Sequence, residues 1–227
     1  SSTPVIFLIA STPALSASAS YWVRVTDNNG SADSSTATVI VNSGSGGGGT
    51  GTRWLFDLGS SSFEMTGNWN NLTSASAGGV SNAVDDAGNS TSVSATVTTA
   101  FSSINSSGSG SNAYPADAQR DNFYVTGTGS VGSSSLGEIT LSGLNDASTY
   151  DLTFFGSRIT SNPRTTRYSA GGQSVHLATS DNTANTVTIS GVSPSSGSIL
   201  VSVEPLDASG TQSEYGYLNV IDLVESD

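Results

Sequence analysis

The feature that most constrains the fold of this chain is a series of ten short segments in which apolar and polar residues alternate between turn-forming residues. A period of two places successive side chains on opposite faces of an extended strand, and the segments lack the 3.6-residue period of an amphipathic helix. This pattern predicts an all-β fold, an antiparallel jelly-roll β-sandwich. The segments are RWLFDLG (53–59), SVSATVTTAF (92–101), DNFYVTG (121–127), GEITLSGL (137–144), STYDLTFFGS (148–157), TTRYSAGG (165–172), QSVHLAT (173–179), NTVTISGV (185–192), GSILVSVEPL (197–206) and YGYLNVIDLVE (215–225).

Three local features of the sandwich follow from the same segments. YSAGGQSVHL predicts a hairpin centred on Gly171 and Gly172, because glycine adopts the positive φ angles of tight turns. Tyr150 lies where a strand begins after a short bend, so we expect its hydroxyl to bond a nearby backbone group. The last strand, 215–225, ends close to the C-terminus, and we expect it to pair with the first strand, 53–59.

A Gly/Ser-rich linker at residues 44–52 separates a short N-terminal segment, 1–43, from the main domain, 53–227. The N-terminal segment contains YWVRVTDNNGSADSSTATVIVN, two alternating runs around a DNNG turn, which predicts a β-hairpin. It resembles the last two strands of a bacterial immunoglobulin-like domain, with Tyr21 at its tyrosine corner. Two or three strands cannot bury a core alone, so we expect this segment to pair with another chain, to pack on the main domain, or to be a remnant.

Composition excludes several classes of function. Eighteen Asp+Glu against six Lys+Arg give a formal net charge of -12, which repels nucleic-acid phosphates. With no cysteine and one histidine, the chain offers no disulfide, no thiolate and little to bind zinc. It has no run near the ~18 apolar residues of a membrane helix, so we expect no membrane insertion. We expect part of a longer exported bacterial protein, placed extracellularly or at the cell surface.

Several stretches together resemble one family. They are WLFDLGSSS, GNWNNLT, YPADAQRDNFYVTG, ITLSGLNDASTYDLTFFGSR, TTRYSAGGQSVHL, NTVTISGVSP and YGYLNVIDL. This ordered set, spanning about residues 53 to 225, resembles the galactose-binding-like, carbohydrate-binding-module type of jelly roll that is appended to exported bacterial polysaccharide-active enzymes. The resemblance implies a non-catalytic module that binds a polysaccharide.

The segment GNWNNLT contributes the first candidate binding residues, Trp69, Asn70 and Asn71. Its Gly and Asn residues favour a loop. An indole face there would stack on the C–H groups of a pyranose while the two amides meet its hydroxyls. The alternative is that Trp69 folds back as a lid on the edge of the sandwich.

The segment YPADAQRDNFY contributes Tyr114, Asp117 and Arg120 as further candidates. Proline stiffens the entry of this loop, and its polar side chains precede a strand. The alternative is an internal bond between Arg120 and Asp121 that orders a long loop.

Half of the chain's positive charge lies within ten residues of FFGSRITSNPRTTRY (154–168), as Arg158, Arg164 and Arg167. Neighbouring strand residues point to opposite faces, so Arg167 and Tyr168 should diverge. The arginine fork suits carboxylate, sulfate or vicinal hydroxyls. Arg158 and Arg164 are therefore candidates, with Arg120, to bind a glycan, including an anionic one such as a uronate or a sulfated galactan. The alternative is pairing with the chain's own carboxylates.

The carboxylate cluster DDAGN makes Asp85, Asp86 and Asn89 candidates for a structural Ca²⁺ site, although it lacks the fixed spacing of an EF-hand loop. The sequence shows no set of catalytic residues: GSSS is not a nucleophile elbow, and the one histidine has no evident partner. We therefore expect a non-enzyme.

Two hypotheses remain after these exclusions. The first is a non-catalytic carbohydrate-binding module of a secreted or cell-surface protein. The second is a structural subunit of an extracellular fibre or surface layer, assembled by β-strand addition through residues 1–43. Whether that segment pairs with its own chain or with another copy would separate them.

Overall fold

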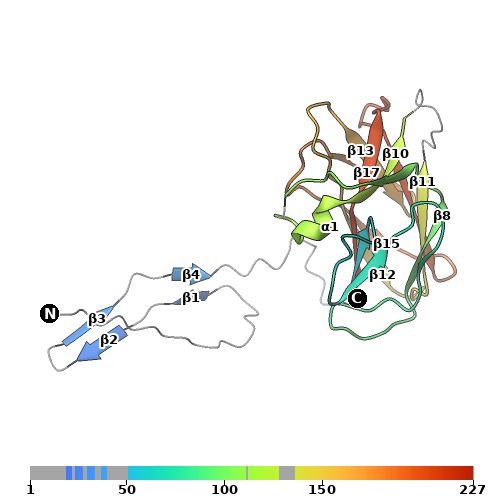
Figure 1. Cartoon of the computed structure of the whole chain (residues 1–227). Coiled ribbons are helices and arrows are strands. Elements are labelled where there is room, and N and C mark those ends of the chain that lie inside the picture. Colours follow the sequence, from blue (N-terminus) through green and yellow to red (C-terminus); the bar gives the residue numbers. More distant parts are fainter. Residues whose placement is uncertain are drawn as a thin grey trace. The chain divides into compact units, whose positions relative to one another are not determined.

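The computed structural model describes residues 51–110, 112–127 and 136–226, together with four short strands between residues 19 and 39. The chain divides into two compact units, Ser1–Ser45 and Gly46–Asp227 (Figure 1).

The first unit contains two antiparallel strand pairs. Strand β2 (Arg24–Asp27) pairs with β3 (Gly30–Asp33), and β1 (Ala19–Tyr21) pairs with β4 (Ala37–Val39). The predicted hairpin with its turn inside DNNG is confirmed. The immunoglobulin-like resemblance and self-association through residues 1–43 stay predictions, because most of that segment lies outside the described residues.

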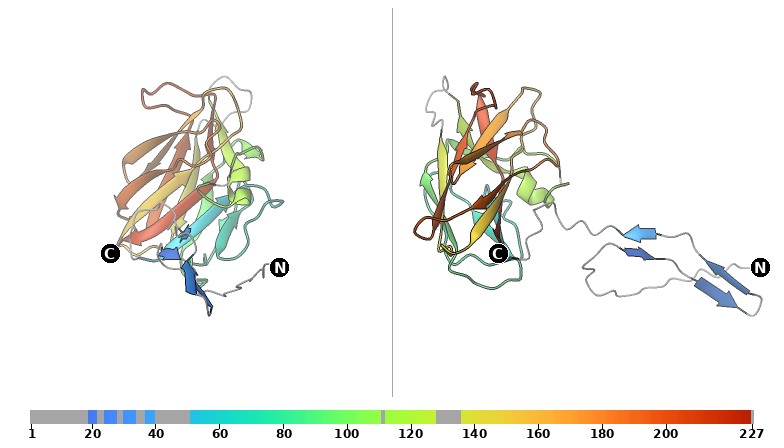
Figure 2. Two further views of the ribbon diagram at one scale, coloured as in Figure 1. Left: turned by 90° about the vertical axis from the view of Figure 1, so that its left-hand side faces the viewer. Right: turned by 180° about the vertical axis from the view of Figure 1, so that it is seen from behind.

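The second unit is a β-sandwich, which confirms the predicted fold class (Figure 2). One sheet has the order β14-β13-β16-β11-β8-β7, and the facing sheet has the order β15-β12-β18-β5-β6. All pairings in the two sheets are antiparallel except that of β5 with β6. The strands are β5 (Arg53–Leu58), β6 (Trp69–Leu72), β7 (Gly79–Val80), β8 (Ser94–Thr99), β11 (Gly137–Ser142), β12 (Thr149–Phe155), β13 (Thr165–Ala170), β14 (Gln173–Ala178), β15 (Val187–Val192), β16 (Ser198–Glu204) and β18 (Val220–Ser226).

The core lies between the two sheets and is built by the alternation that the sequence shows. In β11, Ile139 and Leu141 are fully buried while the residues between them are partly exposed. Phe154 of β12 stacks on Tyr168 of β13 with ring centroids 4.7 Å apart, so the two sheets meet through aromatic contact. Burial of such large side chains supplies the main driving force for this fold.

The predicted local features are confirmed. Strands β13 and β14 form a hairpin in which Gly171 and Gly172 have φ angles of 55° and 77°. The Tyr150 hydroxyl accepts a hydrogen bond of 2.9 Å from the backbone N–H of Asn145. Strand β18, the last, pairs with β5, the first strand of the sandwich.

Two predictions about local structure were wrong. GNWNNLT was expected to be a loop, but Trp69–Leu72 form β6, parallel to β5. The last segment, predicted as one strand, is divided at Asn219 into β17 (Tyr215–Leu218) and β18. The Asn219 side chain accepts from the backbone N–H of Ser157 (2.8 Å) and donates to the carbonyls of Gln119 (2.9 Å) and Asp121 (2.7 Å). This buried polar residue therefore joins three segments at the point where the strand breaks.

The division of the last segment creates a third sheet, of order β17-β10-β9. It contains β9 (Ser103–Asn105) and β10 (Asn122–Thr126), and the short helix α1 (Ala116–Arg120) precedes β10. Figure 1 shows β10 and β17 near β13, at the end of the sandwich away from the C-terminus.

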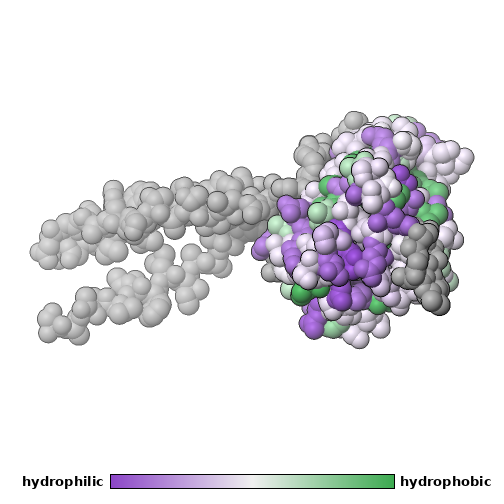
Figure 3. All heavy atoms as spheres, turned by 90° about the horizontal axis from the view of Figure 1, so that it is seen from above, coloured by the Kyte–Doolittle hydropathy of each residue, from purple (hydrophilic) through white to green (hydrophobic). Residues whose placement is uncertain are grey.

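The surface of the second unit seen from above is mainly hydrophilic, with small scattered apolar areas (Figure 3). Ile159 and Leu200 are the large hydrophobic side chains exposed on the described part of the chain. No helix among the described residues is long and apolar enough to cross a membrane.

Candidate functional site: a tyrosine–arginine pocket

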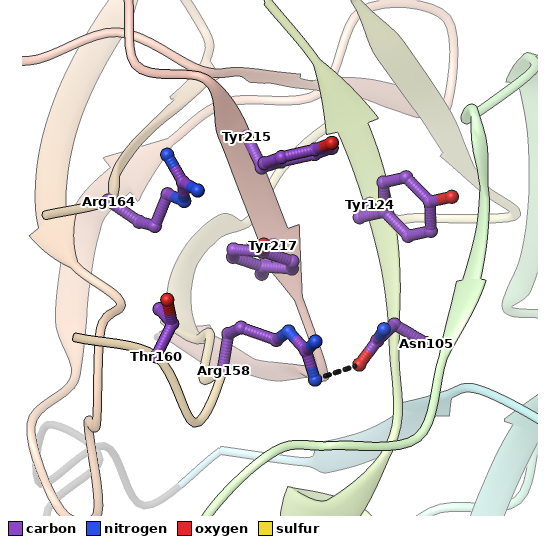
Figure 4. A pocket seen from close by; sticks show the side chains of 7 residues that line it. All are labelled: Asn105, Tyr124, Arg158, Thr160, Arg164, Tyr215 and Tyr217. Atoms are coloured by element: carbon purple, nitrogen blue, oxygen red, sulfur yellow. Dashed lines mark hydrogen bonds between the residues drawn. The ribbon is translucent and has the colours of Figure 1, made fainter. Parts of the chain in front are cut away.

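An open pocket of about 210 Å³ lies over the outer face of the third sheet (Figure 4). Strands β9, β10 and β17 contribute one wall, and the segment between β12 and β13 contributes the other. The lining residues, which we call the tyrosine–arginine pocket, are Asn105, Tyr124, Arg158, Thr160, Arg164, Tyr215 and Tyr217.

Strand alternation gathers the three tyrosines on one face. Tyr124 is directly opposite Tyr217 in the pairing of β10 with β17, and Tyr215 lies two residues before Tyr217. Residues two apart on a strand share a face. The neighbours Phe123 and Leu218 are fully buried in the core, so the tyrosines point outward.

The rings form a continuous aromatic surface. Tyr215 and Tyr217 stack with centroids 6.2 Å apart at 26°, and Tyr124 meets Tyr215 edge-on at 5.8 Å. Tyr217 is only 4% exposed, and burial raises the pKa of its hydroxyl. Tyr124 and Tyr215 are half-buried. Tyr217 therefore forms the floor, and the other two rings are available to a ligand.

Both ends of the loop that carries the arginines are tied to one short segment, residues 179–181. The backbone N–H of Arg158 donates to the Thr179 carbonyl (2.9 Å), and the N–H of Asp181 donates to the Arg158 carbonyl (2.8 Å). The backbone N–H of Arg164 donates to the hydroxyl of Ser180 (2.7 Å), and the backbone N–H of Thr179 donates to the carbonyl of Arg164 (2.9 Å). These backbone bonds hold the two ends of the loop, and with them Arg158 and Arg164, beside the same short segment.

The two guanidinium groups have different partners. Arg164 is 9% exposed and forms a salt bridge of 2.7 Å with Glu214. Its guanidinium carbon lies 5.0 Å from the centroid of the Tyr215 ring, and its buried Nε has no hydrogen-bond partner. Arg158 is half-buried and donates from Nη1 to Oδ1 of Asn105 at 3.0 Å. Arg164 therefore pairs with a carboxylate of its own chain, as the alternative predicted, whereas Arg158 donates to the side-chain amide oxygen of Asn105.

Trp69 and Tyr114 lie apart from this pocket, in a small apolar cluster with Phe155 and Val220. The Trp69 ring packs edge-on against Tyr114 at 6.1 Å, and the Tyr114 hydroxyl donates to Asp222 at 3.1 Å. Burial, together with the contact with Asp222, raises the pKa of Tyr114. Trp69 is half-buried, as Tyr124 and Tyr215 are, and its role as a stacking platform stays a prediction.

The two asparagines after Trp69 have internal partners. The Asn70 amide donates to the carbonyls of Leu55 (3.1 Å) and Val84 (2.9 Å), and its oxygen accepts from the N–H of Val84 (2.9 Å). Asn71 makes a reciprocal pair of 2.9 Å bonds with the backbone of Met65. These amides join loops to the sheet, so Asn70 and Asn71 have structural roles here.

The remaining candidates of the YPADAQRDNFY segment are not brought to the arginine loop. Arg120 is exposed, with its guanidinium carbon 4.2 Å from the centroid of the Phe63 ring. Asp117 is exposed in the first turn of α1. Asp121 accepts a short hydrogen bond from the backbone N–H of Ser60. Arg120 therefore contacts Phe63 and Asp121 bonds Ser60, in place of the Arg120–Asp121 bond that was the alternative.

The predicted calcium ligands form a closed turn. Asn89 donates to both carboxylate oxygens of Asp85, from its backbone N–H (2.7 Å) and from its side-chain amide (2.9 Å). These bonds lower the pKa of Asp85, and Asp86 is exposed. The described residues include no group of three or more His, Cys, Asp or Glu placed to hold a metal ion. Calcium binding stays a prediction.

Two buried carboxyl groups were not anticipated from the sequence. Asp57 is 3% exposed and Asp121 is fully buried, and each has one oxygen without a hydrogen-bond partner. Burial raises the pKa of Asp57 to about 7, with a contribution from the charge of Asp121, and raises that of Asp121 to about 6. Asp57 lies on β5, Asp121 directly follows α1, and neither lines the tyrosine–arginine pocket.

Sequence reasoning missed Asn105, Thr160 and the three tyrosines of the pocket. A usable signal was present: the spacing Y-G-Y at 215–217 predicts two rings on one face, and DNFYVTG places Tyr124 opposite the apolar face. These two strands lie more than 90 residues apart in the sequence, and neither segment alone predicts that they pair.

Comparisons with known proteins give one solved structure to report. No family model matches the chain, and a search of curated proteins finds no match. The solved structure is a carbohydrate-binding module, TmCBM61, in complex with β-1,4-galactotriose, with 17% identity and a TM-score of 0.31; the match covers 59% of this chain and 88% of that one. For the present chain, the geometry of its own pocket carries the functional conclusion.

Proposed function

We propose that this protein is a non-catalytic carbohydrate-binding module that recognises a polysaccharide through the tyrosine–arginine pocket. The observation that supports this proposal is the combination, in one open pocket, of two accessible tyrosine rings with two arginines and an asparagine. A pyranose presents C–H groups on its faces and hydroxyls around its edge. Aromatic rings complement the faces, and guanidinium and amide groups complement the hydroxyls.

The size of the pocket limits how much of a polymer enters it. A volume of about 210 Å³ is below the ~300–1,000 Å³ typical of pockets for drug-sized ligands. We therefore expect the pocket to hold one or two sugar units and the rest of the chain to run over the polar surface outside it. Such a module would belong to a secreted or cell-surface protein, where polysaccharides are encountered.

The test is binding of the intact protein to a panel of plant, algal and microbial polysaccharides, by affinity electrophoresis and then calorimetry. On a retained polysaccharide, Tyr124→Ala should weaken binding by about 1–3 kcal/mol, as for other aromatic stacking platforms. Its melting temperature should show that the domain is folded. Absence of retention on every polysaccharide by the unsubstituted protein would refute the proposal.

The second candidate function is a structural subunit of an extracellular fibre or surface layer. The observation that favours it is the pair of two-stranded sheets, β1-β4 and β2-β3. An isolated two-stranded sheet is marginally stable in water, so these strands gain from a further partner. Light scattering after size-exclusion chromatography, on the full chain and on residues 46–227, would detect association that depends on the first unit.

A further inference from the structure

The arginines of the second unit differ in how their charge is compensated. Arg53, Arg164 and Arg167 each form a salt bridge with a carboxylate. The guanidinium of Arg120 is exposed and lies over an aromatic ring. Arg158 is half-buried, and no carboxylate of the described residues forms a salt bridge with it. It is therefore a partly desolvated arginine without an anionic partner, in a chain of net charge -12.

The Arg158 side chain is held in a defined orientation. Its Nη1 donates to Oδ1 of Asn105 at 3.0 Å and has a longer contact of 3.5 Å with the Ser107 carbonyl. The same Asn105 oxygen accepts from the backbone N–H of Ser107 at 2.9 Å, which orients the amide. In Figure 4 the Arg158 guanidinium lies between Tyr217 and Asn105 on the pocket wall. Since a guanidinium has five N–H donors, donors on Nε and Nη2 remain beyond those of Nη1.

The charge balance of the pocket is positive. Arg158 and Arg164 together face one paired carboxylate, Glu214, which is itself 53% exposed. A neutral sugar would leave the charge of Arg158 partly desolvated and uncompensated when it covers the pocket, and this is unfavourable. A negatively charged oxygen group would compensate that charge and accept a charge-assisted hydrogen bond.

We infer that the tyrosine–arginine pocket selects sugars that carry a negatively charged oxygen group, a uronate carboxylate or a sulfate ester, and that Arg158 binds this group. The inference rests on the proposed function, because it names the class of sugar for the same site. Asn105 acts as a positioning residue for the guanidinium. Tyr124 and Tyr215 contact the ring of the same sugar unit.

The probe has to be a short oligosaccharide with one charged group. An acidic polymer would also be repelled by the net charge of -12, and salt would screen that repulsion and the local attraction together. Matched pairs avoid this problem: a uronate-terminated trisaccharide with its methyl ester, and a sulfated trisaccharide with its unsulfated form. The two pairs separate carboxylate from sulfate as the recognised group.

The experiment is calorimetry of the intact protein with both pairs. The unsubstituted protein should bind at least one charged member about tenfold or more tightly than its neutral partner, the ratio expected for a hydrogen bond to a charged group. Arg158→Gln should reduce that ratio toward one, and Arg158→Lys should retain part of it. The matched control Arg167→Gln, whose arginine pairs with Glu204 outside the pocket, should leave the ratio unchanged.

The outcomes separate this inference from the function on which it rests. Equal affinity for charged and neutral members refutes the inference and leaves glycan binding standing. A preference that Arg158→Gln and Arg158→Lys both leave intact in folded protein also refutes it. Failure of every glycan to bind refutes the proposed function and the inference with it.

Discussion

Two regions of this molecule combine arginine with aromatic rings, and they differ in how the arginine is satisfied. In the first region, which we call the tryptophan cluster, Trp69 packs against Tyr114 beside Arg53 and Asp222. Arg53 donates two hydrogen bonds of 2.8 and 2.7 Å to Asp222, which is 1% exposed and also accepts from the Tyr114 hydroxyl. In the tyrosine–arginine pocket, Arg158 instead donates to the amide of Asn105. The first region is internally complete, whereas the second has hydrogen-bonding capacity for a ligand.

This difference shows that residue type alone does not identify a binding site. Trp69 and Tyr114 have the chemistry of a sugar platform, but their rings pack on each other and on Phe155. Tyr124 and Tyr215 are half-buried to a similar degree, but they line an open pocket that also holds Arg158. Charge compensation, which arises only from the tertiary fold, distinguishes the two clusters.

The largest expected effect is the loss of stability when the tryptophan cluster loses the positive charge of Arg53. Arg53→Gln leaves the buried Asp222 carboxylate with the Tyr114 hydroxyl as its remaining side-chain partner. Removing one member of a buried ion pair costs about 3–5 kcal/mol. Arg158→Gln, by contrast, should change the free energy of unfolding by no more than about 1 kcal/mol. Urea unfolding of both variants checks this, and a smaller loss for Arg53→Gln than for Arg158→Gln would contradict the comparison.

A second effect concerns pH and the buried carboxyl groups Asp57 and Asp121. The pKa of Asp57 is about 7 in the folded state and near 3.9 in an unfolded chain. Between these values the unfolded state has released the proton while the folded state keeps it. Stability therefore falls as pH rises from about 4 to 7, and Asp121, with a pKa of about 6, adds in the same direction.

Asp57→Asn removes the Asp57 contribution, because the amide does not titrate. We expect the difference in stability between this variant and the unsubstituted protein to shift in favour of the variant between pH 5 and pH 8. Thermal melting across pH 4.5 to 8.5 measures the effect, with the exposed Asp86→Asn as a control that should follow the unsubstituted protein. A stability of the unsubstituted protein that rises between pH 5 and 8 would argue against buried, protonated carboxyl groups.

Much of the fold could be predicted from the sequence, because the strands are specified locally. The alternation of Ile139 and Leu141 with polar residues, the Gly171–Gly172 turn and the Tyr150 corner each depend on a few adjacent residues. The break at Asn219 could not be predicted, since that residue lies in an apolar run and its side chain bonds groups some 60 to 100 positions away. The short strand β6 was missed because asparagine usually favours turns. Here the side chains of Asn70 and Asn71 form hydrogen bonds with the backbone of neighbouring segments.

The candidate site was predictable only in part. Arg158 and Arg164 stood out because positive charge is rare in this chain. Their aromatic partners did not, because Tyr124 and Tyr215 meet through the pairing of β10 with β17, and nothing in either segment specifies that pairing. Conversely, Trp69 was selected by type, and its environment of Tyr114 and Met65 became visible only in the fold.

The central claim is that the glycan site is the open tyrosine–arginine pocket and not the tryptophan cluster. The most direct measurement is calorimetry of Tyr124→Ala and Trp69→Ala, side by side, with a glycan that the unsubstituted protein binds, after melting has shown both variants to be folded. We predict an affinity loss of about tenfold or more for Tyr124→Ala, following from ~1–3 kcal/mol of stacking, and a change within about twofold for Trp69→Ala. A large loss for Trp69→Ala with full binding by Tyr124→Ala would contradict the account.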